Sequence, residues 1–223
     1  ILLKYPVMEK VWKVKSKRVD ISQKDWLAKV LALNRGLDTN QKLKEFLNPT
    51  IEQVLNVRLT DIEKAIKRVE EALKNKEKII VYSDYDADGI CATAIMWETL
   101  NDLGCNVMPY VPHRITEGYG MSKSGVEKLA SDGTNLIITV DNGVTAVEQV
   151  EYAKKLNIDV IVTDHHVLPP TPPSPYAMVH STGLCGAGVA WLFCWHLISK
   201  INQDYKDKLM EKLELAALAT IAD

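Results

Sequence analysis

Residues 79–89 (IIVYSDYDADG) constrain the fold more than any other stretch of this sequence. They open with a short apolar run rich in β-branched side chains, which predicts a buried strand. Carboxylates at alternate positions and a glycine follow it: Asp84, Asp86, Asp88 and Gly89. In a locally extended backbone, alternate side chains lean to one side, so these acids would crowd together and repel one another. A bound cation is the simplest relief of that repulsion.

Two later apolar runs also end in acids or imidazoles. Residues 136–140 lead to Asp141, and residues 158–163 lead to Asp164, His165 and His166. Helical patterns separate the runs, so the unit reads β-α-β-α-β with parallel strands, whose carboxyl ends meet at one edge of a sheet. One acidic turn alone is more typical of a solvated N-cap or Asx-turn. Three such strand ends favour a metal site, and oxygen and imidazole ligands suit manganese or magnesium.

The overall composition fits an ordinary globular α/β protein. The chain has 223 residues, of which 47% are hydrophobic and 25% charged. We expect a Rossmann-like parallel sheet of about five strands flanked by helices. It would occupy residues 59–223, after a basic arm and a small helical preface in residues 1–58. The net charge of −2 does not indicate a general nucleic-acid-binding surface, so any DNA contact would depend on local patches.

The cysteines and the lack of a targeting segment indicate a cytoplasmic protein. Cys91, Cys105, Cys185 and Cys194 form no CxxC pair and lie in apolar patterns, as expected of core thiols in a reducing compartment. No signal peptide is evident, and no apolar run is long enough to span a bilayer. The sequence begins without Met and ends inside a helical pattern, so we expect a piece of a longer protein.

The segments around the acidic runs are read as structural. The basic stretch 10–18 contains Trp12 and could contact a phosphate backbone, but a solvated arm is the favoured interpretation. Helices are predicted over residues 21–35, 41–47, 60–74, 144–156 and 209–222 and directly after Gly89, with Ser22 and Thr39 as candidate caps. The proline-rich residues 167–175 predict a rigid connection to a fifth strand at 176–180.

Four motifs carry a family resemblance. DYDADG (84–89), VDNGVTA (140–146), TDHH (163–166) and ATIAD (219–223) resemble motifs one to four of the DHH phosphoesterase superfamily. Within it, the chain resembles the catalytic part of the RecJ family of single-strand-specific 5′ to 3′ exonucleases. LNRGL (33–37), FLNP (46–49), PHRITEGYG (112–120) and CGAGVAW (185–191) extend the resemblance from about Trp26 to the end.

The resemblance implies a set of site residues. Two divalent ions, Mn²⁺ or Mg²⁺, would be held by Asp86, Asp88, Asp141, His165 and Asp223, with Asp141 bridging them. Asp84 and Asp164 would orient these ligands, and His166 and Arg114 would bind the non-bridging oxygens of the scissile phosphate. Without the resemblance, Arg114 would be read as a surface arginine, since loop arginines usually face water.

The implied activity is two-metal phosphodiester hydrolysis, in which an ion-bound water attacks phosphorus in line. The expected substrate is single-stranded DNA, degraded from its 5′ end to mononucleotides during repair and recombination. A helicase or single-strand-binding protein is an expected partner, and we expect a monomer with no membrane contact. The alternatives are another DHH hydrolase, acting on short oligonucleotides, cyclic dinucleotides or pyrophosphate, and a non-catalytic DHH scaffold.

The sequence departs from the family pattern in three places. Tyr82 stands where a histidine is common, and Ser83 replaces a common glycine, which implies fewer protein ligands and more water for one ion. The link at residues 181–183 is shorter than usual. The DHHA1 and OB-like domains expected of a RecJ protein are absent from these residues.

Overall fold

A computed structural model describes residues 26–115 and 117–223 of the chain. The basic arm, Trp12 and the candidate cap Ser22 lie outside the described residues. The chain divides into two compact units, Ile1–Val54 and Leu55–Asp223.

The first unit contains two short helices, α1 (Trp26–Asn34) and α2 (Asn40–Leu47). Both were predicted, and Thr39 is confirmed as the N-cap of α2, since its side chain accepts a hydrogen bond from the Lys42 amide at 3.2 Å. A further helix, α3 (Ile51–Leu55), was not predicted and ends at the first residue of the second unit.

The second unit is built on a five-stranded sheet with the order β2-β1-β3-β4-β5. All neighbouring strands pair in parallel. The strands are β1 (Lys78–Tyr82), β2 (Asn106–Tyr110), β3 (Leu136–Val140), β4 (Asp159–Asp164) and β5 (Ala177–His180). The predicted parallel α/β sheet is therefore confirmed.

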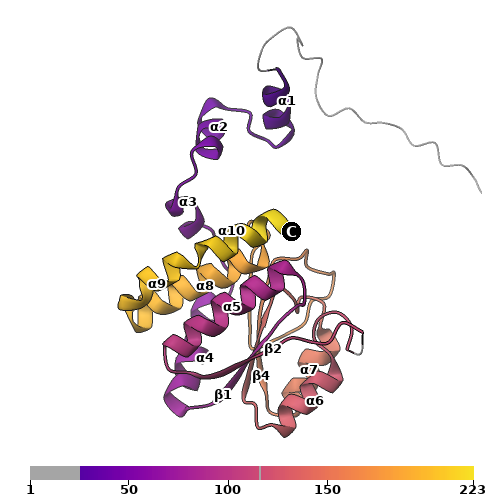
Figure 1. The fold of residues 1–223 in the computed structure, drawn as a ribbon. Helices are drawn as coiled ribbons and strands as arrows, with labels where there is room; N and C mark the ends of the chain where they lie inside the picture. The colour runs from indigo at the N-terminus through magenta and orange to yellow at the C-terminus, as the bar shows by residue number, and fades with distance from the viewer. Residues whose placement is uncertain (1–25, 116) are drawn as a thin grey trace, which may run out of the picture. The chain divides into compact units, whose positions relative to one another are not determined.

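Helices cover both faces of this sheet (Figure 1). One face carries α4 (Ile62–Asn75), α5 (Ala87–Asp102) and α8 (Gly186–Ile201), with α9 (Lys206–Glu211) and α10 (Leu213–Ala222) packed outside them. The other face carries α6 (Lys123–Ser131) and α7 (Val147–Lys155). Because both faces are covered, the strands need apolar side chains on both sides, which explains their nearly continuous apolar runs.

The core follows the alternation of side chains along the strands. On the α6 and α7 side, a buried cluster includes Ile80, Tyr82, Ile137, Val160, Val162, Met121, Val126, Leu129, Val150 and Ala153. The intervening strand residues, among them Ile79, Val81, Ile138 and Ile161, are fully buried under the opposite helices. The four cysteines are free and buried, as predicted. Within residues 26–115 and 117–223, no helix is long and apolar enough to cross a membrane.

The last predicted helix is interrupted. Residues 209–222 were expected to form one helix, but α9 ends at Glu211 and α10 starts at Leu213. At the break, the Lys212 amide donates to the Leu209 carbonyl three residues back, which tightens the turn. The Lys212 ammonium also pairs with Glu98 on α5, so the break is tied to the neighbouring helix.

Candidate metal centre

The acidic side chains meet at the point where the order of the strands reverses. From β1 the chain passes through α5 to β2 on one side, and then returns to β3 on the other side of β1. Open α/β sheets bind ligands at the carboxyl ends of the strands that flank such a point. Here these are the ends of β1, followed by Asp84, and β3, followed by Asp141.

The loop after β1 differs from the extended backbone that the sequence predicted for its three acids. Helix α5 begins at Ala87, before Gly89, so Asp84 and Asp86 precede the helix whereas Asp88 lies within it. Asp86 is the N-cap, and its Oδ1 accepts a hydrogen bond from the Gly89 amide at 2.9 Å. Asp88 lies in the first helical turn and is 2% exposed. The prediction of one extended acidic row was therefore wrong, because capping by Asp86 starts the helix early.

Gly89 and Ser83 tie this loop to α5. An ideal Cβ on Gly89 would lie 2.7 Å from Cβ of Asp84, so the close approach requires glycine. The buried Ser83 hydroxyl contacts the carbonyl of Asp84 and lies 3.1 Å from that of Gly89. It also accepts a hydrogen bond from the Thr93 hydroxyl at 2.5 Å. Serine thus fits at this position through polar contacts with the helix.

The turn after β3 holds Asp141 in an unusual backbone conformation. Its φ is +61°, in the left-handed region that non-glycine residues seldom adopt. Its amide donates to the carbonyl of Thr163 at 3.0 Å. The side-chain amide of Asn142 donates to the carbonyls of Tyr82 and Val140, at 3.2 and 2.9 Å. These bonds join the ends of β1, β3 and β4 and hold the Asp141 backbone in place.

The turn after β4 is organised around the Asp164 carboxylate, which is buried. It accepts hydrogen bonds from the amides of Val144 (3.0 Å), His165 (2.7 Å) and His166 (3.2 Å). It also lies 2.7 Å from Nδ1 of His166. Because a carboxylate accepts, this contact assigns the His166 proton to Nδ1 and leaves Nε2 facing the centre.

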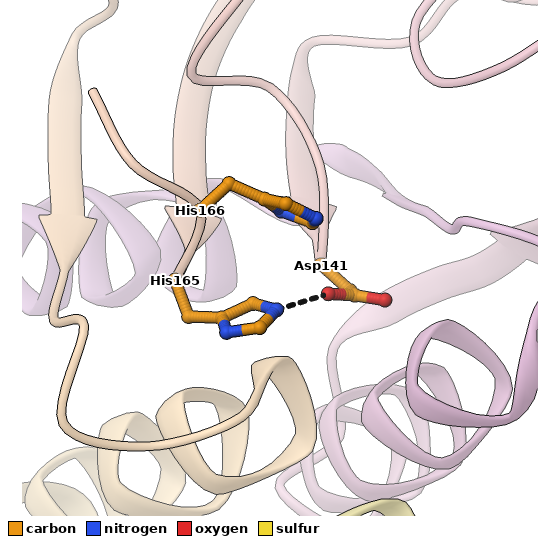
Figure 2. Close-up of side chains that lie close together, drawn as sticks. All are labelled: Asp141, His165 and His166. Carbon is orange, nitrogen blue, oxygen red and sulfur yellow. Dashed lines mark ion pairs between the residues drawn. The ribbon is translucent and has the colours of Figure 1, made fainter. Parts of the chain in front are cut away.

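The five predicted ligand residues, together with Asp84 and His166, fall into three overlapping groups, and within each group the potential ligand atoms lie within 4.8 Å of one another. The groups are Asp84, Asp86 and Asp141; Asp141, His165 and His166; and Asp88, His165 and Asp223. Asp141 and His165 each belong to two groups, so the three groups are connected. Figure 2 shows Asp141 and the two histidines side by side, with His165 turned toward the carboxylate.

Two buried atoms of this centre lack hydrogen-bonding partners. Nε2 of His165 lies 3.2 Å from Oδ1 of Asp141, the ion pair marked in Figure 2. The same nitrogen lies 3.6 Å from Oδ2 of Asp88. Neither His165 Nε2 nor Asp141 Oδ1 makes an aligned hydrogen bond to any described residue. Buried polar atoms rarely remain unsatisfied. A divalent cation would satisfy both atoms, so these residues fit a metal site.

The first turn of helix α8 packs against the acidic side chains of the centre. The amides of Gly186 and Ala187, in its first turn, donate to the two oxygens of Asp88, each at 2.6 Å. An ideal Cβ on Gly186 would lie 2.5 Å from Oδ1 of Asp141. The glycine-containing segment at 185–191 therefore provides close packing beside the site, and the helix N-terminus offsets part of the acidic charge.

Burial perturbs the titration of the acids. The pKa of Asp141 is raised to about 7, mainly by burial, and the charges of Asp88 and Asp86 add to this effect. The pKa of Asp84 is also raised by burial. The contact with Asp141 raises the pKa of His165. Without an ion the centre therefore retains protons near neutral pH, and a divalent cation would displace them.

Arg114 lies outside these acidic groups. It is exposed, and its guanidinium carbon lies 5.1 Å from the ring centroid of Tyr85. Tyr85 packs edge-on against Tyr119 at 6.3 Å, and the Tyr119 hydroxyl lies 3.5 Å from His166 Nε2. The sequence reasoning missed both tyrosines, although Tyr85 stands between two of the acids and Tyr119 lies in the segment that contains Arg114.

Comparison with known proteins identifies the family. A sequence profile described as "DHH family, N-terminal domain" matches residues 78–221, the greater part of the chain. The chain belongs to the DHH family.

Curated RecJ proteins are similar DHH proteins. The chain is 36% identical over 203 residues to the single-stranded-DNA-specific exonuclease RecJ of Bacillus subtilis, covering 86% of this chain and 25% of that protein. It is 34% identical over 215 residues to the protein of the same name from Escherichia coli, covering 88% of this chain and 37% of that protein. The resemblance to RecJ is thus confirmed, and the chain spans about a quarter to just over a third of these relatives.

Solved RecJ structures share the DHH fold. A crystal structure of exonuclease RecJ bound to manganese is 37% identical, with a TM-score of 0.69, and the match covers 75% of this chain and 44% of that one. A structure of RecJ in complex with Mn²⁺ from Thermus thermophilus is 32% identical, with a TM-score of 0.67, and covers 86% of this chain and 27% of that one.

Tyr82, which occupies a position where DHH proteins often have histidine, points away from the acids. Its ring is buried in the core cluster on the α6 side and lies 5.0 Å from that of Tyr110. Its hydroxyl accepts a hydrogen bond from the Ser122 amide at 3.3 Å. Tyr82 therefore supplies no ligand atom to this DHH centre.

Proposed function

We propose that this chain carries the catalytic centre of a metal-dependent phosphodiesterase, a 5′ to 3′ exonuclease that releases mononucleotides from single-stranded DNA. One observation carries the proposal: the buried Asp141 is shared by two groups of potential ligand atoms at the switch point of the sheet. Its buried Oδ1, which makes no aligned hydrogen bond to a described residue, faces His165 Nε2. The RecJ relatives, named as single-stranded-DNA-specific exonucleases, support the choice of substrate, and we place this activity in DNA repair and recombination.

We propose two Mn²⁺ or Mg²⁺ ions as the cofactor. One would be held by Asp86 and Asp141, with Asp84 orienting them, and the other by Asp88, His165 and Asp223. Asp141 lies 3.2 Å from His165, so it would also serve the second ion. When bound, such ions supply an activated water and neutralise the charge that develops on the phosphate. The related structures that contain manganese support the choice of ion.

The protein's own groups would bind and orient the phosphate. Nε2 of His166 faces the centre, because Asp164 holds Nδ1 at 2.7 Å, and it would contact a non-bridging oxygen. Arg114, stacked on Tyr85, would bind a second oxygen from the rim. The pKa of Tyr119 is raised by burial and by neighbouring carboxylates, so its hydroxyl remains protonated and can donate.

A substrate comparison tests the proposal. In Mn²⁺ buffer, 5′-phosphorylated single-stranded DNA, duplex DNA, a cyclic dinucleotide and pyrophosphate are offered to the unaltered protein and to Asp141→Ala. We expect efficient hydrolysis of the single strand alone and no turnover by the variant. Faster hydrolysis of pyrophosphate or the cyclic dinucleotide would replace this substrate with that of another DHH hydrolase. Absence of any hydrolysis, with Mn²⁺ still bound, would favour a scaffold.

The cellular setting is also a proposal. We place the protein in the cytoplasm, as a monomer that receives single strands from a helicase or a single-strand-binding protein. The buried free thiols support a reducing compartment. Sedimentation of the purified protein tests the monomeric state, and pull-down with a single-strand-binding protein tests the partner.

A further inference from the structure

His180, which was not among the predicted site residues, directly contacts the turn at the end of β4, which contains Asp164, His165 and His166. It ends β5 and pairs with Asp164 in the register of β4 and β5. Its side chain is largely buried, and Nε2 lies 2.7 Å from the carbonyl oxygen of His166. Since a carbonyl can only accept, His180 donates from Nε2, and this assigns its tautomer.

This contact completes the attachment of His166. Asp164 holds the amide and Nδ1 of His166, at 3.2 and 2.7 Å, whereas His180 holds the carbonyl on the other side of the same residue. The next residue, Val167, is 84% exposed and begins the proline-rich connection. The hydrogen bond from His180 therefore fixes the last residue of the turn, His166, just before the exposed connection begins.

His180 is itself held firmly. Its amide donates to the Thr60 hydroxyl at 3.0 Å, and that hydroxyl also contacts the carbonyl of Met178. The Asp61 carboxylate accepts from the Met178 amide at 3.1 Å. The segment before α4 thus covers the free edge of β5 and anchors the strand that carries His180.

We propose that His180 is a positioning residue that holds His166 Nε2 toward the substrate phosphate. The inference rests on the proposed function, because it assigns His166 a substrate contact. Its physical basis is the sensitivity of catalysis to placement, since a shift of about 1 Å in a reacting or binding group costs about 100-fold in rate. His165 has other contacts, with Asp141 and Asp88, so metal binding does not depend on His180.

Matched variants separate positioning from simple packing. His180→Phe keeps a ring but removes the donor, whereas His180→Gln places an amide N–H near the position of Nε2. His196→Phe is the control, because His196 is a half-buried histidine on α8 outside the site. Each is measured for kcat and KM on 5′-phosphorylated single-stranded DNA, for Mn²⁺ affinity by calorimetry, and for thermal stability.

We expect His180→Phe to lower kcat by about 10- to 100-fold, with Mn²⁺ affinity changed less than about 3-fold. His180→Gln should recover most of the lost rate, and His196→Phe should match the unaltered protein. Equal loss in the Phe and Gln variants would overturn the proposal, as would a parallel loss of Mn²⁺ affinity.

A spectroscopic measurement keeps the inference testable if the proposed function fails. Long-range ¹H–¹⁵N spectra of the unaltered Mg²⁺-loaded protein report which ring nitrogen of each histidine carries the proton. We expect His180 protonated at Nε2 and His166 at Nδ1, and inorganic phosphate should perturb the His166 signals. In His180→Phe this perturbation should be lost. A His180 protonated at Nδ1, or an unchanged phosphate response in the variant, would refute positioning whatever the enzymatic activity.

Discussion

Asp141 follows β3 and Asp164 ends the neighbouring parallel strand β4, and both are almost fully buried, yet their surroundings are opposite. Asp164 accepts from three backbone amides and lies 2.7 Å from Nδ1 of His166, so the protein itself compensates its charge. Asp141 has a left-handed backbone, and within the described residues its Oδ1 has no hydrogen-bond donor. For these two acids, hydrogen-bond satisfaction, more than burial, therefore separates the orienting carboxylate from the candidate metal ligand.

The largest effect that we predict from the difference between Asp141 and Asp164 is on catalysis. Asp141→Ala removes a carboxylate that belongs to one ligand group and lies 3.2 Å from His165 of the other, so Mn²⁺ binding by calorimetry should be lost or reduced to one weak site. Hydrolysis of single-stranded DNA should fall by at least about 1,000-fold, because metal ions supply several kcal/mol of charge stabilisation. Retention of two Mn²⁺ ions by this variant would remove Asp141 from its bridging position.

For the free energy of unfolding, substitution of Asp164 should have a larger effect than substitution of Asp141. Asp164→Ala leaves buried N–H donors without an acceptor, so the free energy of unfolding should fall by about 3 kcal/mol. Asp141→Ala removes no satisfied hydrogen bond at Oδ1 and should cost much less. Chemical denaturation in chelator-containing buffer measures both. Equal destabilisation by the two substitutions would contradict the difference in hydrogen bonding between Asp164 and Asp141.

A pH series sharpens the comparison further. With its pKa raised to about 7, folded Asp141 keeps a proton that the unfolded chain loses above about pH 4. The metal-free protein therefore loses stability as pH rises between these values, whereas an asparagine does not titrate. Asp141→Asn should gain about 4 kcal/mol over the unaltered protein at pH 8, and little at pH 4.

Saturating Mn²⁺ supplies the control for this series. Because ligand binding stabilises only the protein that binds it, the order of the two melting temperatures at pH 8 should reverse when the ion is added. An Asp141→Asn protein that is less stable than the unaltered one in chelator at pH 8 would contradict the raised pKa.

The smallest effect concerns Tyr82. Tyr82→Phe removes a hydroxyl that accepts from the Ser122 amide, so it should cost about 1 kcal/mol of stability. Mn²⁺ affinity should not change, since the ring faces the core on the α6 side. A weakened Mn²⁺ titration in this variant would show that position 82 contributes to the metal centre.

Much of the fold was predictable because its signals are local. The apolar runs at 79–82 and 136–140 match β1 and β3 to within about one residue. A strand that is buried on both faces needs apolar side chains at consecutive positions, so its sequence alone reveals it. Helix boundaries were less accurate. The start of α5 was placed after Gly89 when Asp86 caps it, and the break at Lys212 was missed, because competing caps and turns depend on packing against other elements.

The candidate site was predictable in its members but not in their grouping. Asp86 and Asp88 are two residues apart in sequence, yet they belong to different groups of ligand atoms. Asp88 pairs with α8 amides 98 and 99 residues away, and His180 reaches His166 across the β4–β5 edge. No local pattern encodes such contacts.

The sequence by itself determined a parallel α/β sheet whose strands end in acids and imidazoles, because periodicity is local and crossover connections bring those ends to one edge. Only the tertiary structure decided which acids share an ion group, which oxygen remains unsatisfied and which histidine holds another in place. Those outcomes depend on the start of α5, the backbone turn at Asp141 and the close approach of α8, and each is set by packing between distant segments.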